Sequence, residues 1–235
     1  MIKYLENKKI LVVVAHPDDE VLGAGGTINK LVKNHRSVIK VIILGEGLTS
    51  RSDERNPDLY KEELKIHKSN IIEAKSILGY QEVNTYDFPD NRFDTVPLIS
   101  LIKTIEKEKE MFSPEVILTH HYGDLNIDHQ KTFEAVTTAC RPLKNETVKT
   151  IITFEIPSST DWQMELNSKQ FKPNLYLILD KENVESKVKA MEKYTYEKRN
   201  FPHPRSPKAI SLLAEYRGMG IGENFAEAFS IVRSK

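Results

Sequence analysis

The sequence predicts an α/β fold, a Rossmann-like, doubly wound, mostly parallel sheet with helices on both faces. Runs of β-branched and leucine residues alternate with stretches of helical apolar spacing, which is typical of repeated strand–helix–strand units. The earliest run is apolar without interruption, as in a strand buried on both faces of a parallel sheet. With 235 residues, 39% of them hydrophobic, the chain can build one sizeable core. We therefore expect a single domain spanning residues 1–235.

The first half of the chain carries the clearest alternation. Residues 10–14 are predicted to form a central strand, followed by a helix that begins within 20–26 and continues through Val32, and by a second strand at 38–44. This is a βαβ unit. The pattern then repeats less regularly, with helices expected at 59–78 and 98–111 and strands at 83–88 and 115–119.

The second half is less periodic. Asp128 is expected to cap a helix that runs to Cys140, because its carboxylate can accept a hydrogen bond from a free first-turn amide. Strands are then expected at 149–156 and 175–179, and helices at 182–196 and 206–217. Residues 157–173 lack periodicity and are expected to form a long surface loop that borders the site.

Composition excludes several classes of protein. Lysine plus arginine and aspartate plus glutamate both number 34, so the basic footprint of a nucleic-acid-binding protein is absent. Cys140 is the single cysteine and is expected to be a buried small hydrophobe. The N-terminal residues lack the apolar core of a signal peptide, and no apolar run is long enough for a membrane span. We expect a cytoplasmic protein with no integral membrane segment.

The first chemical motif, residues 15–20 (AHPDDE), follows the first predicted strand directly. In a parallel sheet, this is where ligand-binding loops lie. A histidine beside adjacent carboxylates is costly to bury unless a divalent cation neutralises the charge. The spacing allows His16 and Asp19 to meet one ion and leaves Asp18 as a base. The alternative is that the acidic residues, Glu20 included, only cap a helix, which is the commoner role for such a string alone.

A second cluster, residues 119–129 (THHYGDLNIDH), follows the fourth predicted strand and emerges at the same sheet edge. One imidazole from it would complete a site of nitrogen and oxygen ligands with a position left for water, the arrangement of catalytic zinc. His129 is the preferred third ligand, because Asp128 is a carboxylate neighbour that can orient it. His120 or His121 taken alone is more often an ordinary buried histidine.

These motifs resemble the LmbE/PIG-L superfamily of zinc-dependent deacetylases. The resemblance rests on residues 15–20, 23–27, 86–90, 128–129, 216–218 and 226–229. It implies that His16, Asp19 and His129 bind one Zn²⁺, with other divalent metals possible, and that Asp18 is the general base. The implied reaction removes the N-acetyl group from an N-acetylglucosamine-type sugar or conjugate. It also implies sugar contacts at Arg51 and Asp90. The alternative for Arg51 is a solvent-exposed arginine that binds no ligand.

The chain departs from the superfamily at one position. Several relatives have a histidine three residues before the last zinc ligand, where this chain has Asn126. Asn126 can donate a hydrogen bond to a developing oxyanion, or His120 or His121 can approach the substrate from the same loop. The alternative for Asn126 is a turn residue. We include Asn126 and Asp128 with Asp18 as candidate catalytic residues, and His120 and His121 as candidate substrate contacts.

Three other functions remain to be weighed. A dinucleotide-binding oxidoreductase suits the fold, but Gly23, Gly25 and Gly26 do not match G-x-G-x-x-G. A serine hydrolase lacks its G-x-S-x-G elbow. A non-catalytic sugar- or metal-binding member of the same fold is compatible with Asn126. The expected partner is a small N-acetylated sugar conjugate, and a homo-oligomer is compatible with the sequence. No motif identifies the aglycone, which residues 157–173 and 201–206 are expected to border.

Overall fold

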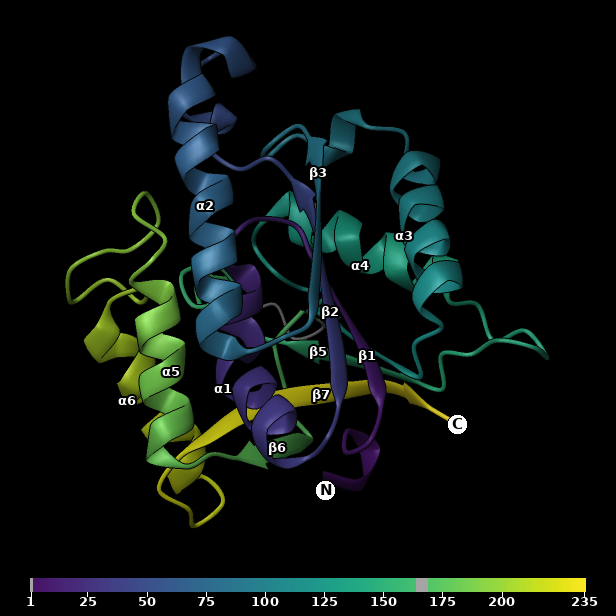
Figure 1. Cartoon of the computed structure of the whole chain (residues 1–235), viewed down its shortest axis with the longest axis vertical. Coiled ribbons are helices and arrows are strands. Elements are labelled where there is room, and N and C mark those ends of the chain that lie inside the picture. The colour runs from purple at the N-terminus through teal and green to yellow at the C-terminus, as the bar shows by residue number, and fades with distance from the viewer. Residues whose placement is uncertain (1, 164–168) are drawn as a thin grey trace.

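The computed structural model describes residues 2–163 and 169–235, and its centre is a seven-stranded sheet of order β3-β2-β1-β4-β5-β7-β6 (Figure 1). The strands are β1 (Lys9–Val14), β2 (Val38–Gly45), β3 (Glu82–Phe88), β4 (Val116–His120), β5 (Thr150–Phe154), β6 (Leu175–Ile178) and β7 (Ala226–Ser234). The first five strands pair in parallel, whereas β7 runs antiparallel to both β5 and β6. The predicted mostly parallel α/β sheet is confirmed.

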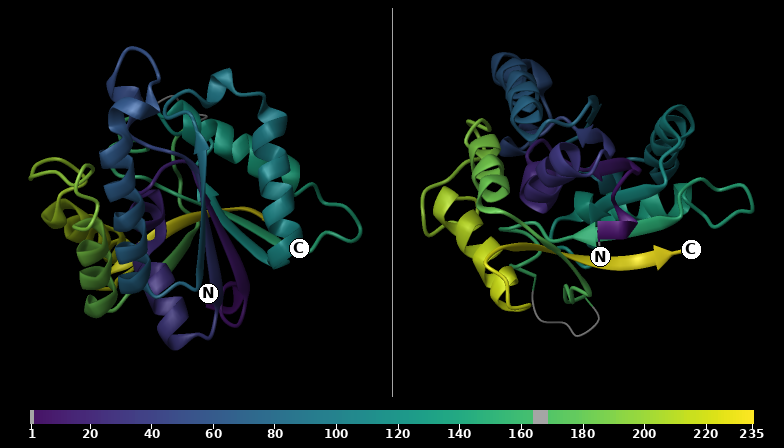
Figure 2. Two further views of the ribbon diagram at one scale, coloured as in Figure 1. Left: turned by 45° about the horizontal axis from the view of Figure 1, so that its top comes forward. Right: turned by 60° about the horizontal axis from the view of Figure 1, so that its bottom comes forward.

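Helices cover both faces of this sheet. They are α1 (Asp19–Asn34), α2 (Lys61–Leu78), α3 (Leu98–Phe112), α4 (Ile127–Ala139), α5 (Lys181–Met191) and α6 (Pro207–Met219). Short 3-10 helices lie at Ile2–Tyr4, Thr49–Arg51, Pro57–Tyr60 and Phe93–Thr95. Figure 1 and the left view of Figure 2 show α1, α2 and α5 on one side of the sheet and α3 and α4 on the other. None of the helices in the described part of the chain is long and apolar enough to cross a membrane.

Two apolar cores result from this layering, because alternate residues of each strand point to opposite faces. In β1, Ile10, Val12 and Val14 pack in the core under α1, α2 and α5, whereas Leu11 and Val13 pack in the core under α3 and α4. Every one of these side chains is fully buried. This double burial explains the uninterrupted apolar run in the sequence.

Several predicted elements differ from the structure. The strand β7 was not predicted, and α5 ends at Met191 rather than Tyr196. Asp128 does not cap α4: Asn126 is the N-cap and its side chain accepts a hydrogen bond from the Asp128 amide, so Asp128 lies in the first turn. The stretch 157–173 is not entirely a surface loop, because its start is buried up to Thr160; positions 164–168 lie outside the described residues.

The strand order reverses between β1 and β4, which are neighbours at the middle of the sheet. Loops at the carboxyl ends of such a pair diverge to opposite faces, and the crevice between them is the usual ligand site of open α/β sheets. Here those loops are residues 15–18 and 121–126. Both motifs singled out in the sequence therefore lie at this crevice.

Candidate metal and catalytic site

A polar cavity of about 250 Å³ opens at the crevice beyond β1 and β4. It is small for a ligand pocket, which fits a small polar ligand better than a large apolar one. Loops and helix starts that follow five strands contribute most of its lining, and α2 and the segments on either side of residue 200 contribute the rest. The lining consists of His16, Pro17, Asp18, Asp19, Gly47, Leu48, Ser50, Arg51, His67, Asp90, Asn91, Asn126, His129, Ser158, Ser159, Trp162, Glu197, Arg199, His203 and Arg205.

His16, Asp19 and His129 offer three ligand atoms that all lie within 4.8 Å of one another. Asp19 Oδ2 is 3.5 Å from His16 Nδ1 and 3.3 Å from His129 Nε2. Ligands about 2.1 Å from a tetrahedral ion are about 3.4 Å from one another, so both separations match a zinc site. Two imidazoles and one carboxylate leave a fourth position open, which is typical of catalytic rather than structural zinc.

The second ring nitrogen of each histidine faces a carboxylate. His16 Nε2 lies 2.8 Å from Asp128 Oδ2, and His129 Nδ1 lies 3.1 Å from Asp124 Oδ1. Such carboxylate partners fix the tautomer and the ring orientation of metal-binding histidines. Burial acts to lower the pKa of His129, but Asp19 and Asp124 outweigh it and raise the pKa to about 9. The donor set therefore fits zinc, which replaces a proton on such an imidazole.

A second group of possible ligands, His16, Asp90 and Asp128, shares the other nitrogen of His16. Asp128 is poorly available as a ligand, because Oδ2 accepts the amide of Asn91 at 2.7 Å and Oδ1 that of Phe93 at 2.8 Å. Its 2.8 Å separation from His16 is a hydrogen-bond distance. The set with Asp19 and His129 is therefore the better metal site, and Asp128 orients His16.

Asp18 lies at the start of α1 with its side chain almost fully buried. Burial raises its pKa well above the ordinary aspartate value, and the Arg205 guanidinium, 3.2 Å from Asp18 Oδ2, acts against that rise. Its backbone has φ 105° and ψ −24°, a conformation that costs a non-glycine residue energy. A buried carboxylate with a raised pKa beside a metal site has the properties of a general base.

Glu20, expected only to begin a helix, also holds Asp18. Its Oε2 accepts the backbone N–H of Asp18 at 3.2 Å, and its Oε1 accepts the Tyr194 hydroxyl at 2.5 Å. Glu20 is completely buried, and burial is the main reason that its pKa rises to about 7. Tyr194 follows α5, so this contact links the segment after that helix to the loop that carries Asp18.

The predicted sugar contacts Arg51 and Asp90 both line the cavity. Asp90 Oδ2 accepts the amide and the hydroxyl of Ser50, at 3.1 Å and 2.7 Å. Arg51 Nη2 pairs with Glu197 Oε1 at 2.7 Å, and Glu197 Oε2 pairs with Arg205 Nη1 at 2.8 Å. Because Arg205 also contacts Asp18, a chain of alternating charges links the outer cavity wall to the candidate base.

Asn126 lines the cavity as predicted, but His120 and His121 are absent from its lining. The Asn126 Oδ1 is used by the helix cap, and its Nδ2 donates to Asn91 Oδ1 at 2.9 Å. His120 is buried beneath the site, where it stacks on His129 at 3.9 Å between ring centroids and accepts the Ala15 amide. His121 is turned to the carbonyl of Lys169. Both histidines are neighbours of the site rather than parts of its wall.

Sequence reasoning missed several residues that hold the site together. Asp124 lies inside the second motif, where its acidic side chain was a visible signal, and it accepts hydrogen bonds from Ser159 and Thr160. Glu197 comes from a segment without periodicity, so no local pattern marked it. Arg205 belongs to residues 201–206, which were expected to border the aglycone, but its ion pair with Asp18 was not predicted. They reach the cavity only because the chain after α5 folds back over it.

Comparison with known proteins agrees with the resemblance that the sequence motifs indicated. Residues 11–140 match the PIG-L family, described as GlcNAc-PI de-N-acetylase. The chain is 26% identical over 199 residues to "Uncharacterized deacetylase YaiS" of Escherichia coli K12, covering 80% of this chain and 91% of that protein. It is 28% identical over 135 residues to "Probable N-acetyl-alpha-D-glucosaminyl L-malate deacetylase 2" of Bacillus anthracis, covering 56% and 59% respectively.

Solved structures share the fold. The N,N'-diacetylchitobiose deacetylase from Pyrococcus horikoshii superposes with a TM-score of 0.76 at 19% identity, over 99% of this chain and 85% of that one. GalB, the 4-carboxy-2-hydroxymuconate hydratase of Pseudomonas putida, superposes with a TM-score of 0.73 at 20% identity, over 97% of both chains. At these identities the likeness shows the fold alone, and the fold hosts more than one chemistry.

The family match spans more than half of the chain and includes His16, Asp18, Asp19 and His129. The resemblance to the LmbE/PIG-L proteins predicted from the motifs is confirmed. This chain belongs to the PIG-L family of deacetylases.

Proposed function

We propose that this protein is a zinc-dependent N-deacetylase that removes the acetyl group from an N-acetylglucosamine-type sugar or sugar conjugate. The observation that carries the proposal is the convergence of His16, Asp19 and His129 beside the buried carboxylate of Asp18, in one small polar cavity. A non-catalytic member of the family would have no need of a buried acid at this position. One domain, a cytoplasmic location and other divalent metals in place of zinc stay predictions.

In this proposal, His16, Asp19 and His129 hold one zinc ion, and Asp128 and Asp124 orient the two imidazoles. Bound zinc supplies Lewis acidity, which lowers the pKa of a water molecule and polarises an amide carbonyl. Asp18 accepts the proton of the attacking water and later delivers a proton to the departing nitrogen. The water oxygen bonds to the acetyl carbon and the C–N bond breaks, so the products are acetate and a free amine.

Arg205 and Asn126 complete the proposed machinery. Arg205 holds the Asp18 carboxylate from the side of the cavity, through Nη1 at 3.2 Å. Asn126 replaces the histidine of several relatives, and its Nδ2 has a second proton besides the one that it gives to Asn91. We propose that this proton serves the developing oxyanion.

Support for a sugar substrate comes from the lining and from the relatives. The cavity has few apolar side chains and is lined by the guanidinium of Arg51, the carboxylate of Asp90 and the amide of Asn91. Such groups can bind several hydroxyls of one sugar ring. The family description names a GlcNAc conjugate, and the names of two similar proteins contain N-acetylated sugars.

The test is acetate release. The purified protein, loaded with one equivalent of zinc, should release acetate and an equal amount of primary amine from methyl N-acetylglucosaminide. Asp18→Asn should keep its zinc and lose most of the turnover, by about 10²-fold to 10⁴-fold. The control Asp58→Asn, which changes an exposed carboxylate outside the lining of this cavity, should keep its activity. Zinc-loaded protein that releases no acetate from a panel of N-acetyl sugars, or equal turnover by Asp18→Asn, overturns the proposal.

A further inference from the structure

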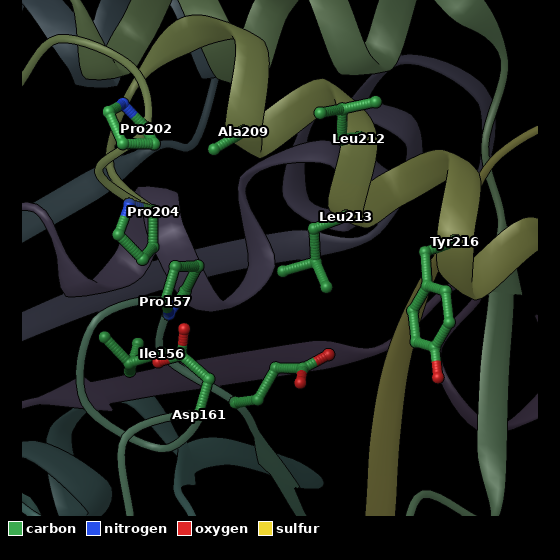
Figure 3. Close-up of a pocket in the computed structure, with 10 residues that line it drawn as sticks. Ile156, Pro157, Asp161, Pro202, Pro204, Ala209, Leu212, Leu213 and Tyr216 are labelled. Atoms are coloured by element: carbon green, nitrogen blue, oxygen red, sulfur yellow. The ribbon is translucent and has the colours of Figure 1, made fainter.

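A second hollow of about 300 Å³ lies next to the metal site and has a different character (Figure 3). Figure 3 shows Pro157, Pro202 and Pro204 on one side of it, opposite Leu212, Leu213 and Tyr216 of α6. Ile156, Ala209, Glu155 and Asp161 complete the lining. We call this hollow the proline groove. Most of its lining is apolar, whereas the lining of the metal cavity is mostly polar.

The proline groove and the metal cavity share a wall that is a single chain thick. In the segment after β5, Pro157 and Asp161 line the groove, whereas their neighbours Ser158 and Trp162 line the metal cavity. The segment before α6 alternates in the same way, with Pro202 and Pro204 on one side and His203 and Arg205 on the other. Both segments are built of turns, closed for example by the hydrogen bonds from the Ser159 amide to the Ile156 carbonyl and from the His203 amide to the Asn200 carbonyl, and side chains leave these turns on two sides.

Contacts between the two segments keep the wall in place. Arg205 Nε donates to Ser158 Oγ at 2.8 Å, and the Trp162 ring meets the His203 ring edge-on at 5.5 Å between centroids. Trp162 is the one tryptophan of the chain, and its large apolar side chain is 52% exposed. Trp162 lines the metal cavity at this wall, and part of the flat apolar face of its indole is open to a ligand.

The two acidic groups of the proline groove are already engaged. Glu155 binds the Arg217 guanidinium through both carboxylate oxygens, at 2.7 Å and 2.5 Å. Asp161 accepts the amide of Ser159 at 3.0 Å. The apolar side chains, in contrast, are open to solvent: Leu212 is 44% exposed and Tyr216 61%. Clustered exposed apolar side chains mark surfaces that bind a protein, a membrane or a ligand, and here they lie beside the candidate metal cavity.

We propose that the proline groove is an aglycone subsite, which binds an apolar alkyl, acyl or aromatic group attached to the sugar in the metal cavity. The inference rests on the proposed deacetylase function and adds the substrate class. In this proposal the aglycone passes over the wall between the two hollows, which is a single chain thick, so one ligand occupies both. The natural substrate is then an amphipathic conjugate rather than a free or highly charged sugar.

Binding can be measured without any turnover. Trp162 lies in the wall between the two hollows, and a change in its fluorescence measures ligand binding there, because no other tryptophan contributes to the signal. A series of methyl, butyl and hexyl β-glucosaminides, which are deacetylated product analogues, is titrated below the concentration at which they form micelles. Affinity should rise about twofold to fourfold for each added methylene, which is the range for partial to complete burial of that group. Equal affinity for all three ligands overturns the subsite.

Two variants of α6 test whether the dependence of affinity on chain length arises in the proline groove. Leu212→Ser should flatten the dependence on chain length while leaving the affinity for the methyl ligand unchanged. Met219→Ser is the matched control: Met219 is a large apolar residue on the same helix, 70% exposed, and does not line the groove. The control should keep the dependence on chain length. If Leu212→Ser and Met219→Ser behave alike, the alkyl group does not bind in the proline groove.

The same ligands separate this inference from the function on which it rests. N-acetylated methyl and hexyl glycosides are compared as substrates, with acetate release as the readout. A higher kcat/KM for the hexyl glycoside, lost in Leu212→Ser, supports both proposals. Turnover that is independent of chain length overturns the subsite and leaves the deacetylase intact. Chain-length-dependent binding without any acetate release overturns the deacetylase alone.

Discussion

The backbone N–H of Asp18 donates a hydrogen bond to the carboxylate of Glu20, with 3.2 Å between the two heavy atoms. Asp18 has φ 105°, and such a conformation costs a non-glycine residue about 1–3 kcal/mol, so it persists only where the surroundings hold it. Tyr194 in turn donates to the other oxygen of Glu20. The unusual backbone that points Asp18 into the cavity therefore depends on a carboxylate two residues away and on a hydroxyl from beyond α5.

We expect Glu20→Ala and Tyr194→Phe to lower kcat by about tenfold, which corresponds to ~1.4 kcal/mol, with little change in KM or zinc content. The reason is that Asp18 relaxes away from its working orientation. Glu20→Gln should retain more activity than Glu20→Ala, because its amide oxygen can still accept the Asp18 N–H. Steady-state kinetics at saturating zinc measures these changes.

The control for this prediction is Asn29→Ala. Asn29 Oδ1 accepts a hydrogen bond from Asn183 Nδ2 at 3.0 Å, so the pair also links α1 to α5 through a buried contact, but it lies outside the cavity lining. This variant should lower the melting temperature without lowering kcat. If Tyr194→Phe shows the same loss of stability with unchanged kcat, Glu20 and Tyr194 act on the fold alone.

Arg205→Gln should move the acidic limb of the pH profile of kcat/KM to higher pH. Burial raises the pKa of Asp18, and the Arg205 charge partly offsets that effect. Removing this charge raises the pKa further, so a higher pH is needed to ionise the base. Arg51→Gln is the control, because Arg51 contacts Glu197 but not Asp18. If the acidic limb of the kcat/KM profile lies at the same pH in Arg205→Gln as in the unchanged protein, the role of Asp18 as the ionised base is contradicted.

Asp124→Ala should weaken zinc binding by about 10-fold to 100-fold, which is the usual effect of removing the carboxylate partner of a metal-binding histidine. Its oxygen lies 3.1 Å from His129 Nδ1. Competition with a chelator of known zinc affinity measures the change. Asp161→Ala serves as the control, since Asp161 accepts an amide of the same turn but is not paired with His129. Equal zinc affinities in the two variants would count against this orientation of His129.

Zinc binding to the metal-free protein should release protons at neutral pH. The pKa of His129 is about 9 in the metal-free protein, so the ring is protonated at pH 7, whereas a zinc ligand must be neutral. Affinity should therefore rise as the pH increases toward 9 and fall as it decreases. Calorimetry in two buffers of different ionisation enthalpy counts the protons.

His67 provides the comparison for that experiment. It also lines the cavity, but burial lowers its pKa to about 4, so it is neutral at pH 7 and has no proton to give up. His67→Gln should leave the number of released protons unchanged. Zinc affinity that is flat between pH 6 and 8 would exclude a protonated His129 in the metal-free state.

Much of the fold follows from local patterns in the chain. The apolar strands β1 and β2 and the helices α2 and α3 were predicted to within a few residues, because their burial imposes a period that the sequence displays. Strand β7 was missed: its first half is buried and its second half alternates with exposed residues, so no single period describes it. The N-cap of α4 was misassigned because Asn126 and Asp128 are both good capping residues.

The sequence by itself singled out the residues that we propose to bind the metal and to act as the base. The carboxyl ends of parallel strands meet at one edge of the sheet. β1 is followed there by His16, Asp18 and Asp19, and β4 is followed by His129. Tertiary structure decided how these groups are held. Asp128 reaches His16 across 112 positions of the chain, and Arg205 reaches Asp18 across 187. Contacts over such separations depend on how whole layers and loops pack together, and no local period of the sequence encodes them.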